Sequence, residues 1–95
     1  MSSCEKLLRK MRRTQSGWNQ HDFEVLYTGF GFSYREGKGH RVYYHEKYTE
    51  LAATVARHGE LAKGYAEHAI DVIARLRKLE AQERRKKKDA QQQRK

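Results

Sequence analysis

The segment from residue 30 to 46 constrains the fold most strongly, because its side chains alternate with a period of two around a short glycine turn. The first arm alternates aromatic side chains with small or charged ones: Phe30, Phe32 and Tyr34. The second arm begins at His40 and ends near Glu46. Alternation of this kind is typical of half-buried strands, and two glycines flanking a lysine at 37–39 favour a tight turn. We therefore predict a β-hairpin.

The alternation also decides which side chains of the second arm point the same way. His40 lies on the face of Val42, and Tyr44 follows on that face. The opposite face carries Arg41, Tyr43 and His45. The Val42 face is a candidate for the core side, in which case a bend at Gly39 would release His40 from it.

Two helices are expected before the hairpin. The first runs from Ser3 to about Thr14, because its apolar residues recur at helical spacing: Cys4, Leu7, Leu8 and Met11. The second begins after Asn19, which with Asp22 has the spacing of a helix cap, and it stops at Gly29. Residues 15–17 form a loop between them.

The chain after the hairpin predicts one more strand and one long helix. The strand runs from about Leu51 to Arg57, with alternate apolar residues on one face. The helix begins near Lys63-Gly64 and carries an apolar stripe as far as Leu79. We expect it to extend past Glu80, where the stripe ends and the basic run begins. The order is therefore α-α-β-β-β-α. This order predicts the α+β class, with a three-stranded antiparallel sheet and helices on one face.

Charge is concentrated at the two ends of the chain. The 95 residues carry a formal net charge of +9, of which residues 1–13 hold +4 and residues 80–95 hold +4. A chain of this length forms one domain. We divide it into a basic amphipathic helix and loop at 1–17, a folded domain at 18–80, and a basic tail at 81–95 that we expect to be frayed or disordered.

Composition also limits the partners and the compartment. Cys4 is the single cysteine, which excludes an internal disulfide framework and a cysteine-rich zinc site and fits a reducing cytosol. No run approaches the roughly 18 apolar residues of a membrane span. We expect a small cytoplasmic protein with no membrane partner. Its basic balance favours nucleic acid as the acidic partner.

Three short motifs carry a resemblance to a known family. Phe23-Glu24 opens a short helix that leads to Gly31-Phe32, Gly39–Tyr43 follows the glycine turn, and Lys63-Gly64-Tyr65 opens the last helix. Over residues 18–80 this pattern resembles the HicA family of toxins from bacterial toxin–antitoxin pairs. The resemblance implies a fold similar to double-stranded-RNA-binding domains, activity as an mRNA interferase, and a HicB-like antitoxin as partner.

The resemblance also implies an active site. The family's catalytic histidine, at the start of the second strand, falls on His40, although Gly39 stands where the family usually has serine. It implies a metal-independent endoribonuclease that needs no cofactor. A histidine suits general acid or base catalysis because its pKa lies near neutrality. We expect further RNA contacts from Arg35, Lys38, Arg41, Tyr43 and His45, with Tyr34, Tyr43 and Tyr44 available to stack on bases.

Two other functions remain open from the sequence. One is an RNA-binding module on the same fold that does not cut, which the glycine at position 39 favours. The other is a small interaction protein whose N-terminal apolar stripe packs on a partner or on a second copy rather than on its own domain. A homodimer or a hetero-oligomer with an antitoxin fits either a toxin or an interaction protein.

Overall fold

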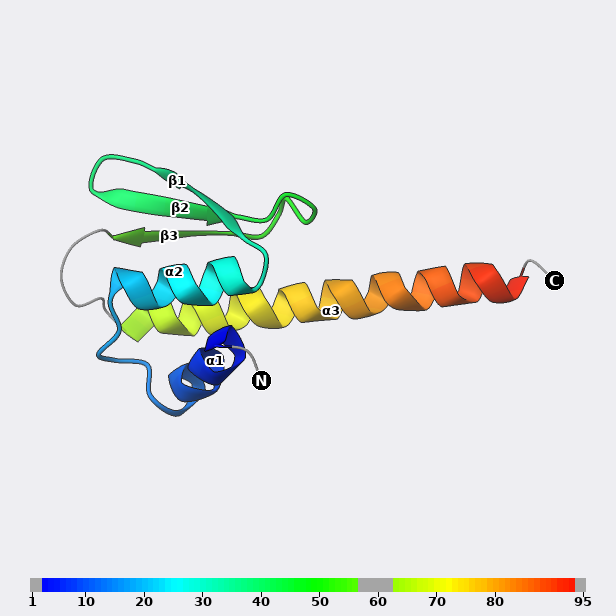
Figure 1. Cartoon of the computed structure of the whole chain (residues 1–95), viewed down its shortest axis with the longest axis horizontal. Helices are drawn as coiled ribbons and strands as arrows, with labels where there is room; N and C mark the ends of the chain where they lie inside the picture. The colour runs from blue at the N-terminus through cyan, green and yellow to red at the C-terminus, as the bar shows by residue number, and fades with distance from the viewer. Residues whose placement is uncertain (1–2, 57–62, 94–95) are drawn as a thin grey trace.

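The structure, a computed structural model, describes residues 3–56 and 63–93. Within them the element order is the predicted one, and the fold is α+β with an antiparallel sheet (Figure 1). The elements are α1 (Ser3–Arg13), α2 (Gln20–Gly29), β1 (Ser33–Glu36), β2 (His40–Tyr44), β3 (Ala52–Ala56) and α3 (Lys63–Gln93). The predicted end of the third strand at residue 57 lies outside the described residues.

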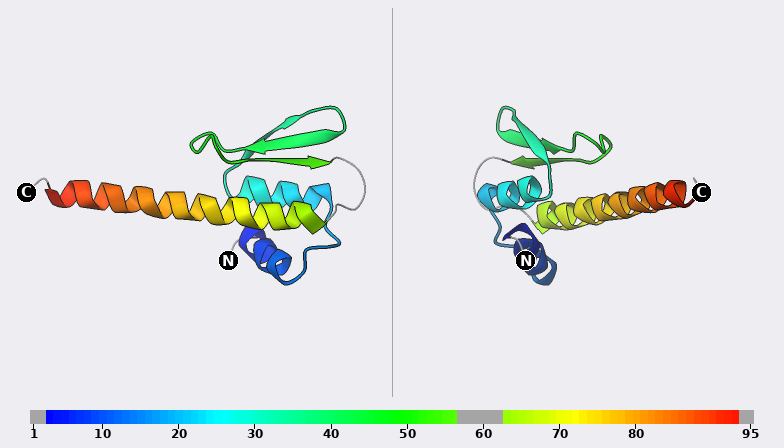
Figure 2. Two further views of the ribbon diagram at one scale, coloured as in Figure 1. Left: turned by 180° about the vertical axis from the view of Figure 1, so that it is seen from behind. Right: turned by 45° about the vertical axis from the view of Figure 1, so that its right-hand side comes forward.

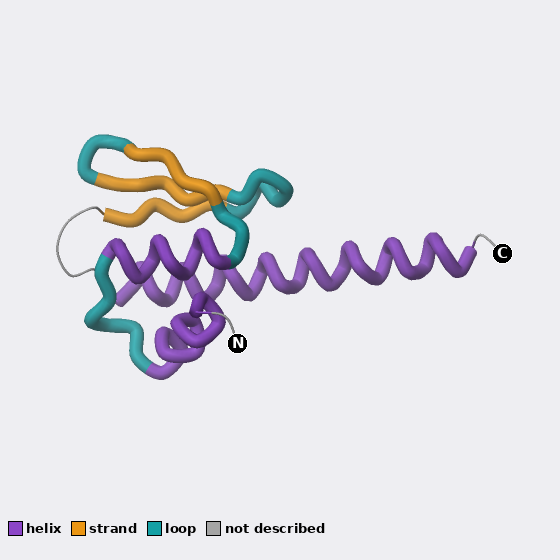
Figure 3. Tube along the Cα trace, in the orientation of Figure 1, coloured by secondary structure: helices purple, strands orange, loops and turns teal. Residues whose placement is uncertain are grey.

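The elements form layers, with all three helices on one side of the sheet. The sheet lies above α2 and α3, and α1 packs beneath those two helices (Figures 1 and 2). Hydrophobic side chains from every layer meet between them in one core cluster. Within residues 3–56 and 63–93, no helix lies over the other face of the sheet (Figure 3). That open face is where side chains of the sheet can reach a large ligand.

The hairpin forms around a two-residue turn. β1 and β2 pair antiparallel with Glu36 opposite Arg41, and the amide of Gly37 donates to the carbonyl of His40 at 2.8 Å. Lys38 and Gly39 close the turn, and Gly39 has a φ of +74°. This left-handed backbone strains residues with a side chain. The turn therefore explains why glycine occupies position 39.

The face of β2 that points to the core is the one that carries Tyr43, not the Val42 face. Tyr43 has 0% of its surface exposed, and its ring stacks on that of Tyr27 from α2 with centroids 4.6 Å apart. Val42 is only half-buried on the other side. The physical reason is size: a tyrosine ring fills the space above α2 better than a valine does, and the alternation of the strand then turns His40 outward.

β3 completes the sheet as the sequence predicts. It pairs antiparallel with β2, and Ala53 lies opposite Tyr43. Its inward residues continue the core: Leu51, Ala53 and Val55 are buried, whereas Ala52 and Thr54 are exposed.

The first two helices also form as predicted and pack on each other. Asn19 and Asp22 make a reciprocal capping box at the start of α2, with N···O distances of 3.1 and 3.0 Å. The apolar stripe of α1 is buried against α2 and α3: Cys4, Leu8 and Met11. That stripe is thus occupied within its own domain and is not a free surface for a partner.

α3 begins where predicted and continues past Glu80, as expected. It starts at Lys63, and residues such as Ala69 and Ile73 pack into the core. The helix continues to Gln93 and projects beyond the domain (Figure 2). That the basic segment 81–95 frays or is disordered stays a prediction. Alanine, glutamine, lysine and arginine favour helix and no glycine or proline interrupts the segment. Among the described helices none is both long and apolar enough to cross a membrane.

The contact between α1 and α2 predicts a large effect for one glycine. A Cβ at Gly29 would lie 2.4 Å from Cβ and 2.7 Å from Sγ of Cys4, so the helices would have to move apart. We expect Gly29→Ala to lower the free energy of unfolding by about 1–3 kcal/mol, measured by urea denaturation. The control is Gly64→Ala, where nothing lies within 4 Å and no loss is expected. Equal stability of the two variants would contradict this close packing.

Candidate nucleic-acid interface

The open face of the sheet gathers several of the residues that the sequence singled out. Because Tyr43 points inward, His40, Val42 and Tyr44 of β2 point outward. Arg35 of β1 lies directly opposite Val42, and Thr54 of β3 lies opposite it on the other side. Directly opposed residues share a face. One surface therefore combines a histidine, an arginine and a tyrosine.

His40 is exposed at the first position of β2. Its imidazole lies over the turn, with Nε2 3.2 Å from the place that a Cβ on Gly37 would occupy. A side chain at position 37 would press on this ring, which would have to shift slightly. Lys38, also exposed, is in the same turn. The turn therefore presents an imidazole and an ammonium group to solvent at one end of the open face.

Arg35 and Tyr44 form the middle of the open face. The Arg35 guanidinium lies over the Tyr44 ring, 5.6 Å from its centroid. His40 is two residues from Val42, the partner of Arg35, so Arg35 and His40 are diagonal neighbours. The Cα atoms of such neighbours are about 7–8 Å apart. A cation and an aromatic ring side by side can contact a phosphate and a base of the same strand.

Arg41 was expected to contact RNA, but its side chain lies on the inner side of the sheet. Its guanidinium forms ion pairs with Glu24 of α2, at 2.6 Å, and with Glu36 of β1. It also lies 4.1 Å from the centroid of the Tyr34 ring, and its side chain is 14% exposed. Desolvation acts to lower the Arg41 pKa, but hydrogen bonds to Tyr43 and to both carboxylates raise it. The group is a fixed cation that joins α2 to the hairpin.

Tyr43, also expected at the RNA surface, is part of the core. Its ring has no exposed face, so no base can stack on it in this structure. Its hydroxyl accepts a hydrogen bond from Nη1 of Arg41 at 3.4 Å. Burial raises the pKa of Tyr43, which keeps the hydroxyl protonated. Tyr34 lies on the same side, 40% exposed, where its ring is already covered by Arg41.

His45 organises the loop between β2 and β3. Its Nδ1 accepts hydrogen bonds from the amides of Lys47 and Tyr48, both at 3.2 Å. Its ring meets the edge of Phe32 with centroids 5.2 Å apart. These contacts are local and give His45 a structural role at the other end of β2 from His40.

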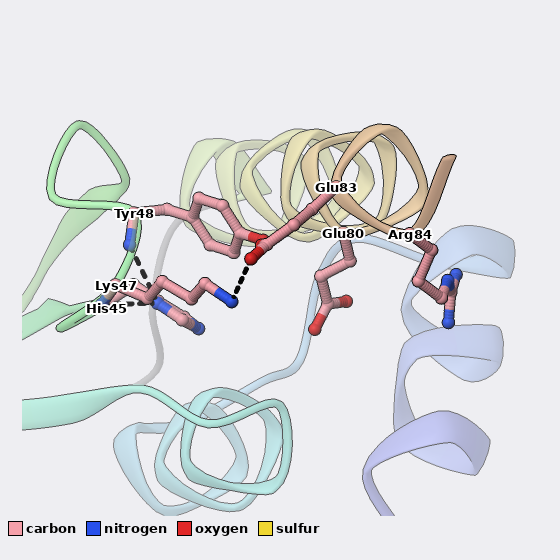
Figure 4. Close-up of a pocket in the computed structure, with 6 residues that line it drawn as sticks. All are labelled: His45, Lys47, Tyr48, Glu80, Glu83 and Arg84. Atoms are coloured by element: carbon pink, nitrogen blue, oxygen red, sulfur yellow. Dashed lines mark hydrogen bonds and ion pairs between the residues drawn. The ribbon is translucent and has the colours of Figure 1, made fainter. Parts of the chain in front are cut away.

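A pocket that the sequence did not indicate lies between this loop and α3 (Figure 4). It is lined by His45, Lys47, Tyr48, Glu80, Glu83 and Arg84. Lys47 forms an ion pair with Glu83 at 2.6 Å, and the Tyr48 hydroxyl donates to the same carboxylate. The hydrogen bond to Glu83 raises the pKa of Tyr48 to about 12. These contacts thus hold the loop against α3, and they join residues as far apart in sequence as Tyr48 and Glu83, which are separated by 35 positions.

The described parts of the chain, 3–56 and 63–93, contain no group of three or more histidine, cysteine, aspartate or glutamate side chains that could hold a metal ion. No family model, curated protein or solved structure matches the chain. The resemblance to the HicA family therefore rests on the sequence motifs alone. What the chain can do has to follow from the chemistry of its own open face.

We expect substitutions of the two hairpin arginines to have unequal effects on stability. Arg41→Gln removes the shared partner of Glu24 and Glu36, and because both carboxylates are partly exposed we expect a loss of about 1–2 kcal/mol in the free energy of unfolding. Arg35→Gln on the open face serves as the matched control and should change it by less than about 0.5 kcal/mol. Urea denaturation measures both. An unchanged Arg41→Gln protein would show that this ion-pair cluster contributes nothing.

Proposed function

We propose that the chain is an RNA-cutting protein of the HicA type, the toxin of a toxin–antitoxin pair, and that its open sheet face binds the RNA. The observation that carries the proposal is the exposure of His40 at the end of that face, beside Lys38 and diagonal to Arg35. A solvent-accessible imidazole among cations suits proton transfer next to a phosphate. The order from α2 to α3, with helices on one face of the sheet, is compatible with a fold like that of double-stranded-RNA-binding domains.

In the proposed reaction the ribose 2′-oxygen attacks the neighbouring phosphorus, and the bond from phosphorus to the 5′-oxygen breaks. His40 acts as the general base that takes the 2′-hydroxyl proton, and the leaving 5′-oxygen takes a proton from water. The products are a 2′,3′-cyclic phosphate and a 5′-hydroxyl. Arg35 and Lys38 offset the charge that grows on the phosphate oxygens, so the scheme requires no metal ion.

The same face gives the proposed protein a way to hold a single strand. Tyr44 offers a half-buried ring for stacking, and Arg35 above it offers a cation for the adjoining phosphate. Neither group selects a base by hydrogen bonding, so we expect weak sequence preference from this pair. An antitoxin would neutralise the protein by covering His40 and its neighbouring cations with acidic side chains.

A second candidate is an RNA-binding module on the same face that does not cut. The observation that favours it is Gly39, which replaces the usual serine of the family motif and has a φ of +74°. If that serine takes part in catalysis, its absence removes the reaction and leaves the binding. The two candidates share the interface and differ only in whether RNA fragments appear.

His40 provides the test that separates them. We expect the purified chain to fragment labelled RNA, to cut equally well in EDTA, and to leave a strand with a 2′-deoxy scissile nucleotide intact. His40→Ala should lower the cleavage rate by a factor of about 10²–10⁴, the usual contribution of general acid–base catalysis. The fold should survive because the side chain is exposed.

The matched control is His21→Ala, which removes another exposed imidazole, on α2, with a side chain 78% exposed. It should cut at the rate of the wild type. Cleavage by His40→Ala at the wild-type rate would rule out the proposed active residue. A salt-sensitive gel shift without fragments from the wild type would instead establish the non-cutting module.

A further inference from the structure

The exposed side of α1 carries a stripe of four cations that the proposed active site does not use. The stripe consists of Lys6, Arg9, Lys10 and Arg13, which line one shallow depression and are all exposed. Their spacing of three, four and seven residues places them on one side of the helix. The opposite side of α1 is fixed against α2 and α3 by its buried residues. The direction of the stripe is therefore set by the core.

The stability of α1 explains only part of this arrangement, because Lys10 and Arg13 lie in its last turn. Lys6 and Lys10, and likewise Arg9 and Arg13, are like-charged pairs at a spacing of four, which repel each other. The helix dipole favours cations in the last turn, but Lys6 lies in the first turn, where it disfavours them. A polyanion bound along the stripe would relieve both effects.

The cationic surface continues beyond α1. Arg12, on the next row of the helix, lines a second depression together with Arg9 and with Arg77 of α3; one carboxylate, that of Glu5, also lines it. α1 lies on the far side of α2 and α3 from the sheet (Figures 1 and 2). The stripe and the open face that carries His40 are therefore separate surfaces of the molecule.

We propose that the stripe on α1 binds the phosphate backbone of RNA as a second contact, away from the site of cutting. Its four cations span about 10 Å of helix axis, and the stripe contains no aromatic or amide side chain that would read a base, so the contact is independent of sequence. The choice of RNA rests on the proposed function. It implies that the preferred substrate is a long or folded RNA able to reach both surfaces.

The test compares two variants that lose the same charge. One is Lys6→Gln/Arg9→Gln/Lys10→Gln/Arg13→Gln; the control is Lys63→Gln/Arg75→Gln/Lys78→Gln/Arg84→Gln, four exposed cations of α3. Glutamine preserves helix propensity, and circular dichroism verifies the fold. The probe is a fluorescent RNA hairpin with 2′-O-methyl riboses, which cannot be cut. Its affinity is measured over a range of KCl concentrations.

We expect the α1 variant to bind the hairpin more weakly and with a shallower salt dependence. The slope of log affinity against log salt should become less steep by about 0.7–0.9 for each lost phosphate contact. The α3 control should keep most of the wild-type slope. An α1 variant with the wild-type slope, or a control that loses as much as the α1 variant, would overturn the proposal; the first result would leave an acidic protein as the partner. Because this probe cannot be cut, the result is independent of whether His40 cleaves RNA.

Discussion

The stacking of Tyr43 on Tyr27 decides what the sheet presents to solvent. Successive side chains of a strand point to opposite faces, so the inward direction of one residue fixes all the others. With Tyr43 buried against α2, His40 and Tyr44 must point outward. A shift of one residue in this strand would bury the histidine and expose the tyrosine. The candidate site is therefore a consequence of the core.

The net charge of the chain is a poor guide to its binding surfaces until each cation is placed. Arg41, close in sequence to His40, is held by two carboxylates and one aromatic ring and serves to join α2 to the hairpin. Arg35 and Lys38 are exposed and remain available at the open face. The cations of α1 point away from that face. Arg41 thus has a structural role, whereas the cations of the open face and those of α1 lie on two separate surfaces.

Much of this fold follows from local signals in the sequence. The cap at Asn19, the glycine turn of the hairpin and the apolar stripes of α1 and α3 each depend on residues within a few positions of one another. Such signals predict where helices and strands lie. They predicted the element order and the presence of helices on one side of the sheet.

Two properties of β2 could not be predicted in the same way: which of its faces points to the core, and which of its side chains are buried. Both faces of the strand mix polar and apolar residues, so the pattern alone does not choose between them. The choice depends on Tyr27 and Glu24, which lie in α2, before the hairpin in sequence, and contact the strand only after folding. The end of α3 is hard to predict for another reason: its last turns have helix-forming residues but no apolar stripe that would indicate where the helix ends.

In the proposed complex, RNA contacts the open face through His40. The imidazole signals of the histidines in an NMR spectrum, assigned by single substitution, test it most directly on addition of RNA with 2′-O-methyl riboses. We expect the His40 signal to shift. The signal of His45, whose Nδ1 accepts two amide hydrogen bonds within its loop, should stay in place. An unchanged His40 signal in a protein saturated with RNA would contradict the proposed contact.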